Sequence, residues 1–195
     1  MKENKNHLSA LITLVTVFFF WGFIAASNGV FIPFCKDYFN LTQFQSQLID
    51  TAFYGAYYFG ALFLFLFSSN RKNDLINKWG YKTSIIYGLL ISIIGSILMI
   101  PSVNFGSFNL ILLSLFIIAI GFCLQQTAAN PFAISLGEPE TGSHRLNLAG
   151  GINSLGTTIG PIIVSLLLFG GIMHTNPQIS NINTLYIFLY LFYLY

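Results

Sequence analysis

Carboxamide side chains gather in two neighbouring apolar stretches of this sequence. Gln125, Gln126 and Asn130 lie near the end of one stretch, and Asn153 and Thr157 lie inside the next. A carboxamide donates and accepts hydrogen bonds, so a group of them can hold a small molecule that carries several hydroxyls. Hydrocarbon penalises an unpaired polar group, so these side chains need partners wherever they lie.

Residue spacing places several of these groups on shared helix faces. Gln126 and Asn130 are four residues apart, as are Asn153 and Thr157, and residues at this spacing lie on one side of a helix. We expect the polar groups to converge on a central cavity that binds a small polar molecule. The alternative is interhelical hydrogen bonding, which stabilises membrane bundles by roughly 0.6–2 kcal/mol per contact. The candidate binding residues are Asn28, Gln125, Gln126, Asn130, Asn153 and Thr157.

Asp50 is the acidic residue that lies clearly within an apolar stretch. A carboxylate inside a membrane is a functional hypothesis by default, so Asp50 is the candidate for coupling to an ion, H⁺ or Na⁺. The alternative is that Asp50 lies near the outer interface, where it is solvated or caps its helix.

The elements that must position these residues are membrane spans. The 195 residues are 55% hydrophobic and 7% charged, with a mean hydropathy of +0.72, whereas soluble domains are about 25% charged. A soluble domain could not cover its surface with so few charges. The net charge of +2, without a basic patch interleaved with aromatic residues, argues against a nucleic-acid partner.

No catalytic chemistry is evident in the sequence. It contains no nucleophile–base pair, metal-ligand set or phosphate loop, so we expect neither an enzyme nor a resident metal or cofactor. Cys35 and Cys123 have no metal-like spacing, and we expect them to be free thiols packed as small apolar side chains.

Apolar stretches long enough to cross a hydrocarbon core of about 30 Å recur along the chain. We expect the first span to be interrupted at 27–29 and to close on Pro33, and the third to end before Pro101. The sixth is too short for a full crossing. We expect an all-α membrane protein, with residues 1–195 as a single transmembrane domain and spans at about 8–34, 45–67, 80–100, 107–136, 145–171 and 182–195.

The basic residues indicate the orientation of these spans. With the N-terminus inside, Lys36 alone falls on the outer side, which satisfies the positive-inside rule. The other seven fall on the inner side: Lys2, Lys5, Arg71, Lys72, Lys78, Lys82 and Arg145. The first apolar run is too long for a cleaved signal and lacks a small-residue cleavage site. We therefore expect a multi-pass protein of the inner (plasma) membrane, surrounded by lipid, with a cytoplasmic N-terminus.

Spans one and four carry similar interruptions. Gly22-Phe23 and Pro33-Phe34 occur in span one, and Gly121-Phe122 and Pro131-Phe132 occur in span four. Corresponding interruptions in the first and fourth of six spans are typical of a 3+3 inverted repeat, although so short a match can also arise by chance.

Four motifs resemble a known transporter family. The loop 74–82 has an acid followed by basic residues around a glycine, and it resembles the cytoplasmic signature of the major facilitator superfamily. The patterns in 44–54, 127–132 (Thr-Ala-Ala-Asn-Pro-Phe) and 145–149 (Arg-Leu-Asn-Leu-Ala) are similar to those of the L-fucose permease family of sugar symporters. The resemblance covers about residues 10–185, and it implies the N-terminal six-helix half of a major facilitator fold with a truncated sixth helix.

Three positions depart from that family. An Asp expected after the Asn of span one is here Gly29, a Glu expected before Thr127 is here Gln126, and a Gln expected three residues before Asn153 is here Gly150. A glutamine can bind a hydroxyl but cannot carry a proton at physiological pH. The sugar can therefore differ from fucose, and Asp50 is the remaining candidate for ion coupling.

The resemblance also implies a gate at the inner face, which we assign to Asp74 and Arg145. The alternative is an ordinary solvated loop, where ion pairs contribute little. We expect Gly156 and Gly160 to pack helices closely. Tyr54, Tyr57 and Tyr58 are expected to pack or face lipid, with stacking on a sugar as the alternative.

The function implied by the resemblance is cation-coupled symport of a hexose or deoxyhexose by alternating access. That mechanism rocks two halves around a central site. We therefore expect this chain to be a fragment, or a prematurely terminated reading frame, that lacks the C-terminal six-helix half as its partner. A non-transporting sugar sensor or assembly partner, and a half-transporter that works as a dimer, are the alternatives.

Overall fold

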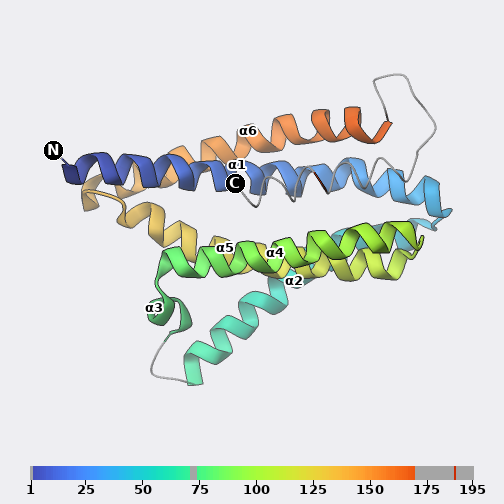
Figure 1. Ribbon diagram of the computed structural model, residues 1–195, viewed down its shortest axis with the longest axis horizontal. Coiled ribbons are helices and arrows are strands. Elements are labelled where there is room, and N and C mark those ends of the chain that lie inside the picture. Colours follow the sequence, from blue (N-terminus) through green and yellow to red (C-terminus); the bar gives the residue numbers. More distant parts are fainter. Residues whose placement is uncertain (1, 71–73, 170–186, 188–195) are drawn as a thin grey trace.

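The computed structural model describes residues 2–70, 74–169 and 187, and over these the chain is helical (Figure 1). Five of the helices are long and apolar enough to cross a membrane. The expected sixth span, 182–195, lies outside the described residues apart from residue 187. The elements are α1 (Lys2–Phe39), α2 (Gln43–Asn70), α3 (Leu75–Trp79), α4 (Tyr81–Asn104), α5 (Phe108–Ser135), the 3₁₀ turn η1 (Pro139–Thr141) and α6 (Gly142–Phe169).

The helix α1 is unbroken, so the expected interruption at 27–29 and the expected end at Pro33 are wrong. Hydrocarbon offers the backbone no partner outside the helix, so a membrane helix persists through residues that would end a soluble one. The Ser27 hydroxyl donates to the carbonyl of Phe23, one turn earlier, and is thereby satisfied within α1. For the same reason Pro101 lies inside α4, which runs on to Asn104.

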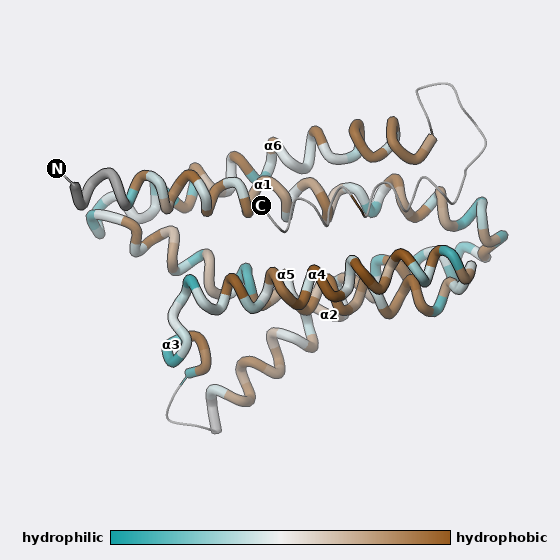
Figure 2. The backbone as a smooth tube through the Cα atoms, viewed as in Figure 1, coloured by the Kyte–Doolittle hydropathy of each residue, from teal (hydrophilic) through white to brown (hydrophobic). Residues whose placement is uncertain are grey.

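The connections contain more structure than the sequence indicated. The polar connection at 68–79 includes α3, and the charged loop at 137–144 includes η1 and the start of α6. Five residues are too few to show a helical periodicity, so α3 left no clear signal in the sequence. Hydrophilic residues gather near the helix ends and apolar residues fill the middle of the bundle (Figure 2).

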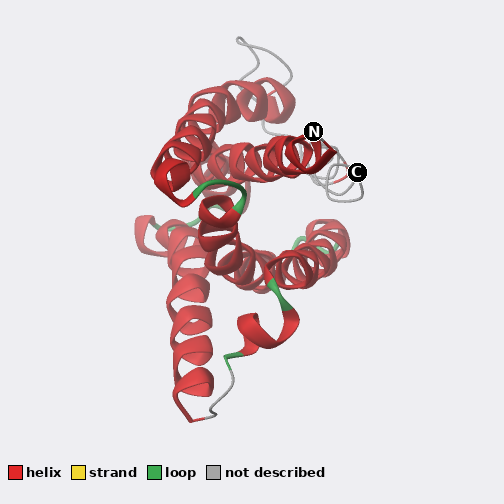
Figure 3. Ribbon diagram, turned by 90° about the vertical axis from the view of Figure 1, so that its left-hand side faces the viewer, coloured by secondary structure: helices red, strands yellow, loops and turns green. Residues whose placement is uncertain are grey.

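Two tightly packed helix pairs form the bundle. α4 lies along α5, α1 lies along α6, and α2 packs on α5 and α1 (Figures 1 and 3). Gly156 and Gly160 face α1 so closely that a Cβ at Gly160 would lie 2.5 Å from the carbonyl oxygen of Phe23. The expectation of small-residue packing at these two glycines is therefore confirmed.

The second half of α2 diverges from the bundle. Ile49, Phe53 and Ala56 in its first half are buried, whereas Phe63 and Phe65 are more than 60% exposed. In Figure 1 this end of α2 runs away from α5 towards α3. The divergence opens α2 to its surroundings on two sides, and the candidate site lies on one of them.

Candidate functional site

Two adjacent glutamines on α5 have very different surroundings. Gln125 is fully buried: its Oε1 accepts from the indole Nε1 of Trp21 at 3.0 Å, and its Nε2 donates to Ser92 Oγ at 3.1 Å. Ser92 in turn donates to the carbonyl of Ile118 at 3.1 Å. The Gln125 amide therefore links α5 to both α1 and α4. This is the interhelical hydrogen bonding that the sequence analysis gave as the alternative to ligand binding.

The partners of Gln125 were missed in the sequence. Trp21 was hidden in a run of aromatic residues. Ser92 belongs to a row of small residues on α4, with Ser84, Gly88 and Ser96, at helical spacing. Small residues at this spacing indicate a helix face that packs closely on a neighbouring helix, so this row could have pointed to the α4–α5 contact.

Gln126, by contrast, lines an open pocket between α2 and α5. The pocket has a volume of about 410 Å³, and we call it the α2–α5 pocket. Its lining residues are Tyr57, Tyr58, Ala61, Cys123, Gln126, Thr127 and Asn130. The side chains of Gln126 and Asn130 are partly exposed and form no hydrogen bond with the described part of the chain. Both amides can therefore bind a ligand without breaking a contact in the fold.

Tyrosines face these two amides across the α2–α5 pocket. Tyr58 is 64% exposed, and Tyr57 is partly buried against Phe53. Cys123 donates from its Sγ to the carbonyl of Tyr57 at 3.5 Å, which fixes α2 against α5 at this level. An aromatic face opposite two carboxamides is a combination that suits a polyhydroxylated ligand.

Asp50 lies beside Asn28, where α2 packs on α1. The Nδ2 of Asn28 donates to Asp50 Oδ1 at 3.4 Å, and Asn28 is buried while Asp50 is partly exposed. Two candidates that are 22 residues apart in sequence therefore meet. The alternative that Asp50 caps its helix is wrong, because α2 begins at Gln43 and its first turn is capped by Thr42 and Gln45.

The two candidates on α6 each donate a hydrogen bond to a backbone carbonyl. Asn153 donates from Nδ2 to the carbonyl of Phe18 at 2.8 Å, which links α6 to α1. Thr157 is exposed and donates to the carbonyl of Ser154 at 2.7 Å. Neither residue lines the α2–α5 pocket.

The proposed gate residues each stabilise a helix end. Asp74 caps α3 by accepting from the backbone N–H of Ile76 at 3.0 Å, and it also accepts from Ser68 Oγ at 3.1 Å. Asp74 and Arg145 are thus engaged at different helix ends in this structure. A gate contact between them stays a prediction.

Arg145 holds the connection between α5 and α6. Its guanidinium donates to the carbonyls of Ala133 (3.0 Å) and Ile134 at the end of α5, and to that of Glu138 (3.0 Å) in the loop. It also donates to Thr141 Oγ1 at 2.7 Å. The carbonyls of Ala133 and Ile134 carry the negative end of the α5 dipole, so a cation is favourable there.

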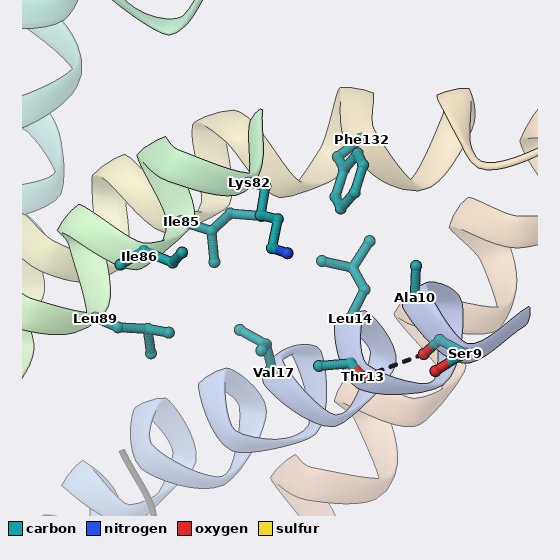
Figure 4. Close-up of a pocket in the computed structure, with 10 residues that line it drawn as sticks. All are labelled: Ser9, Ala10, Thr13, Leu14, Val17, Lys82, Ile85, Ile86, Leu89 and Phe132. Carbon is teal, nitrogen blue, oxygen red and sulfur yellow. Dashed lines mark hydrogen bonds between the residues drawn. The ribbon is translucent and has the colours of Figure 1, made fainter. Parts of the chain in front are cut away.

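A second hollow of about 420 Å³ lies between α1, α4 and α5 (Figure 4). The Lys82 side chain extends into it, towards Leu14, and most of the other lining residues are apolar (Figure 4). None of the candidate binding residues lines this hollow. Its few polar groups suit a polyhydroxylated ligand less well than those of the α2–α5 pocket.

Comparison with known proteins decides the family. The model of the Major Facilitator Superfamily matches residues 11–194, nearly the whole chain. The chain belongs to the major facilitator superfamily. Its fold is the expected one: it matches a major facilitator transporter, FucP, crystallised in the outward conformation, with a TM-score of 0.73 and 28% sequence identity. The match covers 96% of this chain and 48% of that structure, so the helices correspond to its N-terminal half.

Curated members of the superfamily that resemble this chain are bacterial sugar transporters. A glucose/galactose transporter of Brucella abortus (biovar 1, strain 9-941) is 39% identical over 166 residues, which are 85% of this chain and 38% of the relative. A putative glucose/galactose transporter of Helicobacter pylori (strain J99) is 38% identical, over 95% of this chain and 43% of the relative. The L-fucose-proton symporter of Escherichia coli (strain K12) is 32% identical, over 92% and 39%.

The chain spans about two fifths of the length of these curated relatives. The superfamily consists of transporters rather than enzymes, as expected from the sequence. The resemblance to the fucose permease family is confirmed.

Proposed function

We propose that this chain is the first half of a bacterial secondary transporter that binds a neutral hexose in the α2–α5 pocket. Its N-terminus lies in the cytoplasm, and a second six-helix half completes the transporter. The sugar hydroxyls bond to Gln126 and Asn130, and a face of the ring stacks on Tyr58. Asn28, Asn153 and Thr157 do not line this pocket and stay predicted sugar-binding residues.

One observation carries this proposal. Gln125 and Gln126 are neighbours, yet of the two only the Gln125 amide forms hydrogen bonds with other described side chains. A polar side chain in a membrane helix that forms no internal hydrogen bond must meet water or a ligand. Gln126 and Asn130 share one helix face and line the same pocket with Tyr57 and Tyr58. The relatives named for glucose, galactose and fucose transport support a hexose as the ligand.

Ion coupling is assigned to Asp50. Gly29 and Gln126 cannot bind a proton, whereas Asp50 is a partly exposed carboxylate beside Asn28, the residue that precedes Gly29. Binding of H⁺ or Na⁺ at Asp50 would break or reshape its hydrogen bond to Asn28. That bond joins α2 to α1, so the ion can influence how α2 packs beside the sugar pocket.

Equilibrium binding of labelled D-galactose, D-glucose and L-fucose to the purified chain in lipid nanodiscs tests the proposal. Gln126→Ala and Asn130→Ala should each weaken binding about tenfold or more, since losing a hydrogen bond of about 1.4 kcal/mol changes affinity tenfold. Thr158→Ala is the control: it removes an exposed hydroxyl on α6 that bonds only to its own helix, at the carbonyl of Ser154. Equal affinities for the parent chain and both alanine variants would refute the assignment.

A further inference from the structure

A large apolar hollow lies on the other side of the α2–α5 contact. It has a volume of about 620 Å³ and is bounded by the second half of α2, by α3, and by α4 and α5. We call it the α2–α3 hollow. Its lining includes Phe59 and Phe63 of α2, Trp79 of α3, and Ile120 and Leu124 of α5, and it contains no charged residue, amide or hydroxyl among the described residues.

A close contact between α2 and α5 separates the α2–α3 hollow from the α2–α5 pocket. A Cβ on Gly60 would lie 3.0 Å from the Sγ of Cys123, so α2 and α5 nearly touch there. On one side of this contact lie the tyrosines and amides of the α2–α5 pocket. On the other side the lining is apolar apart from the indole N–H of Trp79 and the thiol of Cys123. The α2–α5 pocket therefore suits a polar ligand, whereas the α2–α3 hollow suits hydrocarbon.

The hollow is continuous with an apolar helix face. Ile91 of α4 lines it, and the neighbouring Tyr87, Leu90 and Ile94 are all more than 40% exposed. A row of exposed apolar side chains on a membrane helix is a lipid-facing surface. An empty hollow in that surface would leave its lining without van der Waals partners, so a hydrocarbon chain is favoured to fill it.

Size also favours a lipid chain over a protein helix. A helix with its side chains is about 10 Å across, so it would fill 620 Å³ within roughly 8 Å of its length, about one and a half turns. The hollow is therefore too small to enclose a crossing helix, whereas an extended acyl chain is much thinner.

Groups suited to a lipid headgroup lie at one end of the α2–α3 hollow. Trp79 lines the hollow and packs edge-on against Tyr87, with ring centroids 5.2 Å apart. Lys78, the preceding residue, is exposed on α3. α3 lies at the end of the bundle where the chain begins, the side that the basic residues mark as cytoplasmic (Figure 1). Tryptophan, tyrosine and lysine are typical of the level of the headgroups.

We propose that the α2–α3 hollow binds one acyl chain of an anionic phospholipid, with the headgroup phosphate at Lys78. The lysine supplies the charge that selects an anionic headgroup, and Trp79 fixes the depth of the lipid. The bound chain supports the half of α2 that leaves the bundle. Because α2 also lines the α2–α5 pocket, a lipid bound on the opposite side of α2 stabilises the shape of that pocket.

Native mass spectrometry of the purified chain tests this proposal. The chain is titrated with phosphatidylglycerol or with phosphatidylcholine of identical acyl chains, and bound lipids are counted. One phosphatidylglycerol should bind more tightly than phosphatidylcholine. Lys78→Gln should weaken phosphatidylglycerol binding about fivefold, the effect of one basic residue near a membrane surface. Lys82→Gln is the matched control, because Lys82 is on the same side but extends into the other hollow (Figure 4).

A second variant tests the acyl-chain part of the hollow. Ile120→Trp fills the α2–α3 hollow and should reduce binding of both phospholipids, whereas Lys78→Gln should affect mainly the anionic one. Equal binding of the two lipids, or equal effects of Lys78→Gln and Lys82→Gln, would overturn the proposal. Dimers that Ile120→Trp disrupts, in place of lipid adducts, would also overturn it and indicate a second copy of the chain as the occupant. Sugar binding plays no part in these measurements, so they stand apart from the proposed transport.

Discussion

Replacing Gln125 by leucine should destabilise the helix bundle, although the two side chains are similar in size. The substitution removes the bonds to Trp21 and Ser92 and leaves the indole N–H of Trp21 unpaired in a buried place. Interhelical hydrogen bonds in membranes contribute about 0.6 kcal/mol on average and up to about 1.7 kcal/mol. Two of them give an expected loss of about 1–3 kcal/mol.

The assay is thermal unfolding of the detergent-solubilised chain, followed by the fraction that stays monodisperse. For a chain of this length each kcal/mol corresponds to about 2–4 °C, so Gln125→Leu should lower the midpoint by roughly 2–12 °C. Gln126→Leu is the control, because it makes the same change one residue along, where no hydrogen bond is lost. It should change the stability by less than about 0.5 kcal/mol.

A double-mutant cycle isolates the bond between Trp21 and Gln125. Trp21→Phe and Gln125→Leu should together destabilise the bundle by less than the sum of their separate effects, with an interaction of about 0.6–1.7 kcal/mol. Strict additivity, or a Gln125→Leu variant as stable as Gln126→Leu, would refute the distinction between a structural and a ligand-binding glutamine.

Three further predictions concern packing, the inner loops and coupling. Gly156→Leu should prevent α1 and α6 from packing and cause loss of folded protein in detergent, whereas Gly151→Ala, in open space, should leave the yield unchanged. Arg145→Ala should free the α5–α6 connection and speed its cleavage by a glutamyl protease in inside-out vesicles, because the guanidinium no longer holds the carbonyls of Ala133 and Glu138. Asp50→Asn should abolish the pH or Na⁺ dependence of galactose binding while binding itself persists; an unchanged dependence would remove Asp50 from coupling.

Hydropathy and length predicted the membrane helices well because hydrocarbon leaves a spanning backbone few alternatives to a helix. The same constraint explains the error in α1. In water, Asn28, Gly29 and Pro33 would together favour a break, but in this bundle the helix continues through them to Phe39. Helix-breaking residues therefore carry less information in an apolar segment than the sequence analysis assumed.

The site was only partly predictable from the sequence. The i, i+4 spacing predicted that Gln126 and Asn130 share a helix face, and both line the α2–α5 pocket. It could not show that Gln125 is bonded on both sides, because its partners lie 104 and 33 residues away and depend on how three helices pack. The meeting of Asn28 with Asp50 was hidden for the same reason. Long-range partners follow from packing geometry, which residue spacing does not contain.

Protection of the α2–α5 pocket from a thiol reagent by sugar is the most direct test of the central claim. Ala61 is exposed and lines the pocket, while the native Cys35 and Cys123 are buried, so Ala61→Cys provides a selective label. D-galactose should slow maleimide labelling of Ala61→Cys, and sugar should not affect labelling of Phe105→Cys, which is 79% exposed outside the pocket. Labelling of Ala61→Cys at the same rate with and without saturating sugar would contradict a sugar site between α2 and α5.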